Sequence, residues 1–101
     1  DIAIAIDRMQ QWLDIPVQRV QHSWAGLRSF FDDKDPVAGF DPQAEGLFWY
    51  AGQGGFGVQS SPALSRAAAA ILLGHTVPQT LGDAGLTKAR LSPQRLEPLF
   101  V

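Results

Sequence analysis

The sequence predicts a small α+β fold, because two helical patterns flank two short apolar segments. One helical pattern lies in residues 1–15 and the other in the alanine-rich residues 58–73. The apolar segments 37–40 and 47–51 have the length and composition of strands, and the polar residues 41–46 between them are typical of a turn. We therefore expect an amino-terminal helix, a few strands, a long alanine-rich helix and a short final helix.

The amino-terminal residues admit either a strand or a helix. Isoleucines alternate with alanines over 2–6, as in a strand, but apolar residues also recur at helical spacing from Ile2 to Leu13. The longer pattern favours a helix. Pro16 disfavours helical geometry at the residue before it, so we expect the helix to end at Ile15.

The central segments are interpreted as strands and turns. Residues 17–31 are interpreted as a strand region that Gly26 interrupts with a bulge or a close backbone approach. Residues 32–36 read Asp-Asp-Lys-Asp-Pro, and we interpret the three aspartates as a solvated turn rather than a metal site. Five aromatic side chains are expected in the core: Trp12, Trp24, Phe30, Phe48 and Trp49.

The carboxy-terminal third contains the long helix and its boundaries. Gly74 follows the apolar helix 58–73 at the position where a glycine commonly ends a helix. We expect residues 76–91 to form a loop with a short turn of helix. Ser92 and Pro93 then provide an N-cap and a first residue for a short helix over 94–96.

The composition excludes several classes of function. The net charge is −2 and no basic stripe occurs, so a nucleic-acid partner is not expected. There is no cysteine, and the two histidines form no HExxH motif, so no metal is expected. The longest apolar run, 67–73, is too short to span a bilayer, and no signal peptide is visible. We expect a cytoplasmic protein, with membrane association only through an electron acceptor.

The glycine-rich segment Gly52–Gly57 matches G-x-G-x-x-G and lies between an expected strand and an expected helix. A dinucleotide fingerprint also needs a second strand that ends in an acidic residue about 20 residues on. No such strand follows Leu73, and no acid occurs before Asp83. The loop can still bring an electron-rich or anionic group against residues 54–59, because glycine permits close approach and a helix amino terminus attracts negative charge. A tight structural turn is the alternative.

Three blocks of sequence resemble the carboxy-terminal part of FAD-dependent oxidoreductases of the D-amino acid oxidase type. The blocks are HSWAGLRSF at 22–30, PVAGF at 36–40 and GLFWYAGQGGFGVQSSP at 46–62. The first block looks most like D-arginine dehydrogenases and similar D-amino acid dehydrogenases. The segment LSPQRL at 91–96 is similar to their closing segment.

The resemblance implies that the chain is the carboxy-terminal fragment of a flavoenzyme with a FAD-binding domain and a substrate domain. Residues 1–45 would belong to the substrate or sheet region. Residues 46–101 would supply a strand, the flavin-facing loop, a helix and the tail of the FAD domain. The ADP-binding segment of such enzymes has its own glycine fingerprint, which does not occur in this sequence. We therefore expect the isolated chain to be inactive and to bind FAD weakly.

The resemblance also implies an activity. Such an enzyme oxidises a D-amino acid or a related amine to an imine by hydride transfer to FAD, and water then converts the imine to a keto acid. The implied partners are a small-molecule amine or amino acid substrate and the remainder of the same flavoenzyme. Two alternatives stay open: a non-catalytic binding or interaction domain, and a glycine- or sarcosine-type amine oxidase of the same family.

The resemblance implies substrate-binding and flavin-binding residues, but no catalytic side chain on this chain. Arg28 would hold the substrate, because a guanidinium can grip a carboxylate with two parallel hydrogen bonds. The carbonyl of Gly55 and the side chain of Gln59 would touch the substrate amine or side chain. Phe56 stands where relatives often carry tyrosine, a departure from the family pattern. The residues implied to contact FAD are Gly26, Leu27, Arg28, Gly54, Gly55, Phe56, Gly57, Val58 and Gln59.

Overall fold

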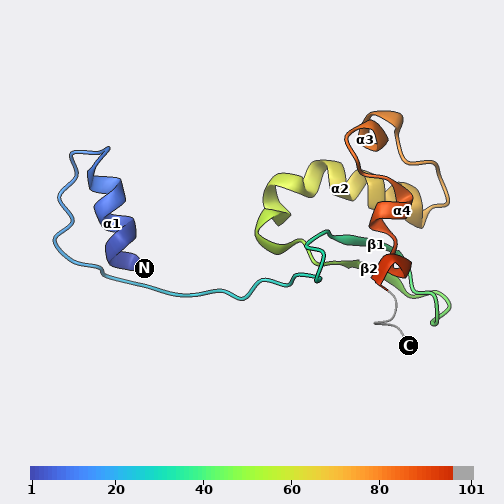
Figure 1. The fold of residues 1–101 in the computed structure, drawn as a ribbon, viewed down its shortest axis with the longest axis horizontal. Coiled ribbons are helices and arrows are strands. Elements are labelled where there is room, and N and C mark those ends of the chain that lie inside the picture. Colours follow the sequence, from blue (N-terminus) through green and yellow to red (C-terminus); the bar gives the residue numbers. More distant parts are fainter. Residues whose placement is uncertain (97–101) are drawn as a thin grey trace.

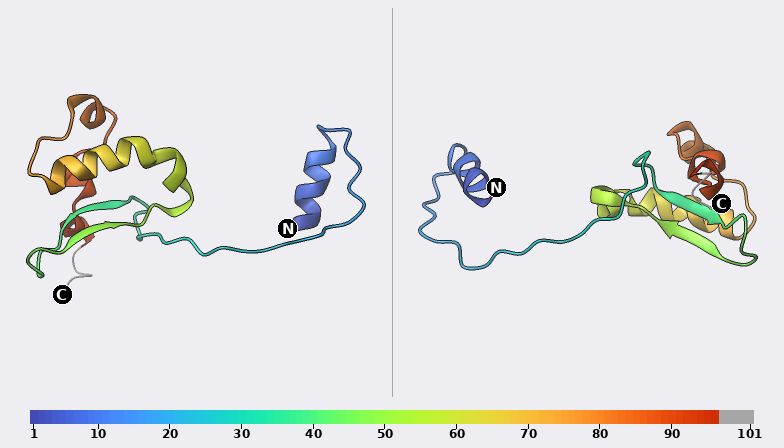
Figure 2. Two further views of the ribbon diagram at one scale, coloured as in Figure 1. Left: turned by 180° about the vertical axis from the view of Figure 1, so that it is seen from behind. Right: turned by 60° about the horizontal axis from the view of Figure 1, so that its bottom comes forward.

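The computed structural model describes residues 1–96, which form an extended arm and a compact body (Figure 1). The radius of gyration is 19.0 Å, whereas a compact chain of 100 residues would have about 13 Å. The arm begins with helix α1 (Ile2–Gln10), which has no buried residue. Figure 2 shows from two further sides that α1 lies well away from the body.

Two expectations for the arm were wrong. Helix α1 ends at Gln10 rather than at Ile15, and the side-chain amide of Gln10 donates to the Ile15 carbonyl at 3.2 Å. Residues 17–31 form no strand. A strand needs a neighbouring strand for its backbone hydrogen bonds, and none of the described strands lies beside this segment.

The body is built on an antiparallel hairpin of β1 (Val37–Phe40) and β2 (Phe48–Ala51), which confirms both expected strands. Val37 lies opposite Ala51, and Phe40 lies opposite Phe48. The Asp41 carboxylate holds the intervening turn. It accepts hydrogen bonds from the amides of residues 43 and 44 at 2.7 and 2.8 Å and from the Trp49 indole at 2.7 Å. The indole bond is the main cause that lowers the pKa of Asp41.

Helix α2 (Gly57–Leu72) confirms the expected alanine-rich helix; it packs on β1 and forms most of the core. Its small side chains let the helix approach the hairpin closely. Leu64 is fully buried, and burial of a leucine side chain stabilises a fold by about 1.5–3 kcal/mol. The buried cluster comprises Ala38, Leu64, Ala67, Ala68, Ile71 and Leu91.

Gly74 ends α2 as expected. It has a φ of +72°. Its amide donates to the Ile71 carbonyl at 3.2 Å, and the amide of His75 donates to the Ala70 carbonyl at 2.7 Å. This pair of bonds is a Schellman motif, which requires a left-handed residue at Gly74.

The role of Gly74 predicts different effects on stability for two glycine-to-alanine substitutions. Gly74→Ala should lower the free energy of unfolding by about 1–2 kcal/mol, since a side chain is strained at positive φ. Gly82→Ala is the matched control, because Gly82 lies in a helix and a Cβ at either position meets no atom within 4 Å. Gly82→Ala should be neutral or stabilising by up to about 1 kcal/mol. Urea denaturation of both variants measures the difference, and equal effects would contradict the assigned cap.

Three short segments complete the described chain. Helices α3 (Gln79–Asp83) and α4 (Lys88–Leu91) occupy the stretch that was expected to be mainly loop. The Thr87 hydroxyl accepts a hydrogen bond from the Arg90 amide at 3.1 Å and so caps α4. A 3₁₀ turn, η2 (Pro93–Leu96), follows, and the Ser92 hydroxyl accepts from the Gln94 amide at 3.2 Å, which confirms the expected cap.

The aromatic side chains were mostly placed wrongly. Trp12 and Trp24 are 86% and 89% exposed in the arm, and Phe30 and Trp49 are also exposed. Phe48 alone among the five packs against the core cluster. Aliphatic and alanine side chains of α2 and β1 fill the core instead. Within residues 1–96, no helix combines the length and the hydropathy needed to cross a membrane.

Candidate functional site

Residues 28–31 lie against the glycine loop, although they are more than 20 positions away in the sequence. The Gly54 amide donates a hydrogen bond to the Ser29 carbonyl at 3.0 Å. A Cβ placed on Gly52 would lie 2.5 Å from Cε2 of Phe31, and one placed on Gly54 would lie 2.8 Å from Cδ1 of Phe30. Both glycines have positive φ. Glycine is therefore needed at 52 and 54 to admit the protein's own aromatic rings.

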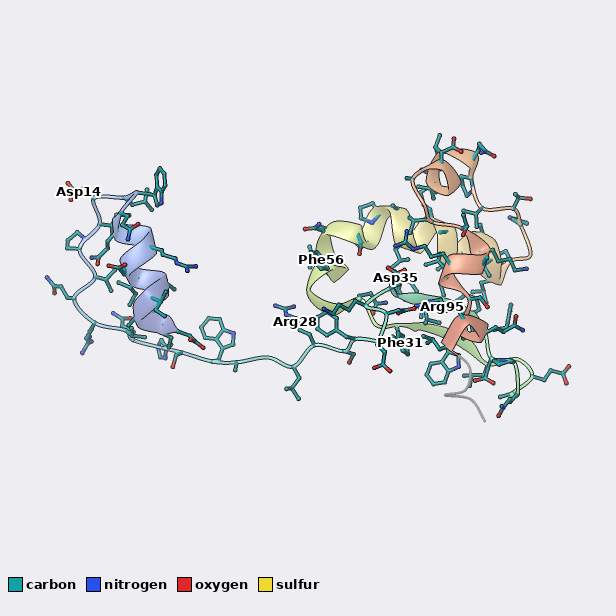
Figure 3. All side chains as sticks on the ribbon, viewed as in Figure 1. Asp14, Arg28, Phe31, Asp35, Phe56 and Arg95 are labelled. Carbon is teal, nitrogen blue, oxygen red and sulfur yellow. The ribbon has the colours of Figure 1, made fainter. Side chains whose placement is uncertain are left out.

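Arg28 lies beside Gly55, so the structure brings together two of the three predicted substrate-binding residues. Cδ of Arg28 is 3.9 Å from the position that a Cβ on Gly55 would occupy. Figure 3 shows Arg28 near Phe56, at the end of the body from which the arm departs. The guanidinium is exposed, and it forms no ion pair within the described part of the chain. It is therefore available to a ligand.

The third predicted substrate residue, Gln59, lies in the first turn of α2. A 3₁₀ turn, η1 (Gly54–Phe56), leads directly into this helix. The first turn of α2 holds no acidic residue, and no side chain caps it. Phe56 and Val58 are 63% and 93% exposed, so the surface around this helix terminus is open. A helix amino terminus favours a negatively charged or electron-rich group.

Hydroxyl groups hold the first turns of α2 in shape. Pro62 has no N–H to donate to the Val58 carbonyl, and the Ser61 hydroxyl donates to that carbonyl instead, at 2.9 Å. The Ser60 hydroxyl donates to the Phe56 carbonyl at 2.7 Å. The two serines before Pro62 therefore donate to carbonyls at the start of the helix, where no charged side chain is present. Sequence reasoning missed this role, and the proline within the expected helix was the signal that could have revealed it.

Two of the predicted flavin contacts, Gly26 and Leu27, do not meet the loop in the described chain. A Cβ on Gly26 would have no atom within 4 Å, so the expected bulge or close approach there is not observed. Leu27 is fully exposed. Gly57 and Gly55 adjoin the helix start, whereas the Gly54 amide is already bonded to Ser29. The contacts of these residues with FAD stay predictions.

Four charged side chains form a structure that sequence reasoning missed, here named the aspartate clamp: Asp33, Asp35, Arg90 and Arg95. Nε of Arg95 donates to Asp33 at 2.7 Å, and Nε of Arg90 donates to Asp35 at 2.7 Å. Asp35 and Arg95 lie close to β1 (Figure 3). The partners are separated by 55 and 62 positions in the sequence, and no local pattern predicts such a pairing.

The arginines of the clamp lower the pKa values of both aspartates. The hydrogen bond from Arg95 is the main cause for Asp33, and the hydrogen bond from Arg90 is the main cause for Asp35. A carboxyl whose pKa is lower in the folded state stabilises the fold above its unfolded pKa, which is about 3.9 for aspartate. That contribution is lost as the pH falls through the lower folded pKa. The clamp is therefore fully charged at neutral pH and is released only in acid.

Among the described residues, no group of three or more His, Asp or Glu side chains is placed to hold a metal ion. A family model described as FAD dependent oxidoreductase matches residues 1–71. The match includes the arm, the hairpin, the glycine loop and most of α2. It therefore spans every predicted site residue, from Gly26 to Gln59.

Proposed function

Because the chain belongs to the family of FAD-dependent oxidoreductases, we propose that the protein oxidises a D-amino acid or a related amine to an imine. The cofactor of the family is FAD, which supplies the hydride acceptor for this chemistry. The observation that carries the proposal is the position of Arg28, an exposed residue whose side-chain stem adjoins Gly55 at the open start of α2.

The residues around the start of α2 fit a flavin ring. Gly55 is exposed, and a Cβ there would meet only the Arg28 side chain within 4 Å. A planar ring can therefore approach the backbone closely at this position. The helix terminus carries no acid that would repel electron density on the ring. In the proposal, Gly55, Gly57 and the backbone of Val58 hold the ring edge.

Arg28 defines the substrate class in this proposal. A guanidinium is always charged at physiological pH, and its planar fork matches a carboxylate. An amino acid bound through its carboxylate to Arg28 would place its amine toward Gly55, where the Gly55 carbonyl can accept a hydrogen bond. Gln59, in the first turn of α2, can meet the substrate side chain. Residues 1–45 would form part of the substrate region, and residues 46–101 part of the FAD domain.

The test is a substrate screen of the full-length protein with its flavin. Oxidised flavin absorbance is recorded without oxygen as D-amino acids, glycine, sarcosine and decarboxylated amines are added. We expect D-amino acids to bleach the flavin and to yield keto acids. Bleaching by sarcosine or glycine alone would support the amine oxidase alternative instead. Full flavin occupancy without bleaching by any amine would contradict the proposed function.

A further inference from the structure

Arg28 is held in place by the residues that follow it in the sequence and not by those that precede it. Residues 18–27, on its amino-terminal side, are all exposed. On its carboxyl side, the Ser29 carbonyl accepts from Gly54, and the rings of Phe30 and Phe31 lie over Gly54 and Gly52. Residues 29–31 therefore hold Arg28 beside the glycine loop, and a contact that fixes the chain just after Phe31 is expected to keep these residues in place.

The aspartate clamp holds the chain at this point. Lys34 has a φ of +61°, and its amide donates to the Phe31 carbonyl at 2.9 Å, so the chain turns sharply after Phe31. The Asp35 amide closes the turn by donating to the Asp33 carboxylate at 3.0 Å. The carboxylates of Asp33 and Asp35 are engaged by arginines from the carboxy-terminal segments α4 and η2.

Arg95 is well suited to fix the turn. Its side chain is only 16% exposed, and it donates to the Asp33 carboxylate, to the Asp35 carbonyl at 2.7 Å and to the Ser92 carbonyl at 3.1 Å. Arg90 grips Asp35 with two parallel bonds of 2.7 and 3.0 Å. A bidentate pair restricts orientation as well as distance. The turn is thus fastened to the body by both its side chains and its backbone.

We propose that Asp33 and Asp35 are positioning residues, which act through Arg95 and Arg90 to hold residues 28–31 on the glycine loop and Arg28 at the substrate. The proposal rests on the proposed substrate role of Arg28. In this proposal the segments α4 and η2 contribute to substrate binding through Arg90 and Arg95, although both segments lie outside the glycine loop.

The test compares the double variant Asp33→Asn/Asp35→Asn with Asp32→Asn in the full-length protein. Asparagine keeps the shape of the side chain but removes the charge that pairs with arginine. Asp32 is the matched control, because it belongs to the same turn and has no hydrogen bond or ion pair from its side chain within residues 1–96. Hydrogen exchange of residues 52–56 reports the bond from the Gly54 amide to Ser29, and exchange of residues 64–71 in α2 serves as the internal reference.

In the double variant, exchange at 52–56 should become about tenfold faster while exchange at 64–71 changes little, since two partly exposed ion pairs are removed. The KM for the carboxylate substrate should rise roughly tenfold with a much smaller change in kcat, because binding rather than chemistry is impaired. The KM of the double variant for a decarboxylated amine should change much less. Asp32→Asn should resemble the unaltered protein in every measurement.

Three results would overturn the proposal. Unchanged exchange at 52–56 would show that the clamp does not hold residues 28–31. An equal rise in exchange at 64–71 would show that the clamp stabilises the whole body instead. Faster exchange at 52–56 with an unchanged KM would show that the held segment does not position a substrate group. If the protein oxidises no amine, the proposed function fails, and the exchange measurement alone still decides whether the clamp holds the segment.

Discussion

Substitution of Arg28 by methionine should lower kcat/KM for an amino acid by about tenfold to a hundredfold, because hydrogen bonds to charged groups contribute about 1.5–3 kcal/mol. Methionine keeps an apolar stem of similar length and removes the guanidinium. The decarboxylated amine of the same substrate should lose much less, since it presents no carboxylate to Arg28. Steady-state kinetics with both substrates measure the ratio directly.

The matched control is Arg66→Met, which makes the same change of charge at an exposed position on α2. Arg66 lies within the helix and away from its first turn, so both substrates should react as with the unaltered protein. Equal losses for the amino acid and the amine in Arg28→Met would assign Arg28 to the flavin or to the fold. If kcat/KM falls for neither substrate, Arg28 is an exposed arginine of the arm that has no role in substrate binding.

The hairpin and α2 were predictable because their signals are local. Two apolar segments bounded by polar turns gave β1 and β2, and the apolar spacing from Val58 onward with Gly74 at its end gave the long helix. The strand expected over 17–31 failed for the converse reason. Alternation describes a surface with two faces, but a strand also needs a partner, and a partner is a property of the tertiary structure.

The proximity of two candidate site residues was expected from the family resemblance, whereas the contacts that hold them were not. The resemblance pointed to Arg28 and Gly55, and the structure brings them together. The glycine pattern indicated close approach but not its cause, which is the ring of Phe31 at Gly52 and the ring of Phe30 at Gly54. The clamp was missed entirely. An aspartate-rich turn has the same composition whether water or distant arginines surround it.

The close approach of Phe31 to Gly52 makes a strong prediction about stability. Gly52→Ala should lower the free energy of unfolding by about 2–5 kcal/mol. Of this, about 1–2 kcal/mol is the cost of a side chain at positive φ, and about 1–3 kcal/mol is the cost of overpacking against a ring. Gly52 has a φ of +76° and is buried, and the ring of Phe31 is the group that an added Cβ would meet. Urea denaturation of the variant measures the loss.

Gly46→Ala separates the two causes, because Gly46 has a similar φ of +81° and a Cβ there would meet no atom within 4 Å. Gly46→Ala should therefore show only the backbone cost, about 1–2 kcal/mol. In the double variant Gly52→Ala/Phe31→Ala the ring is removed, so the overpacking cost should vanish and the combined loss should be smaller than the sum of the single losses. Two results would show that the Phe31 ring does not clash with a Cβ at position 52. One is a loss of unfolding free energy in Gly52→Ala no larger than in Gly46→Ala. The other is a loss in the double variant equal to the sum of the two single losses. The segment that carries Arg28 would then be held on the loop by the Ser29 hydrogen bond and the clamp alone.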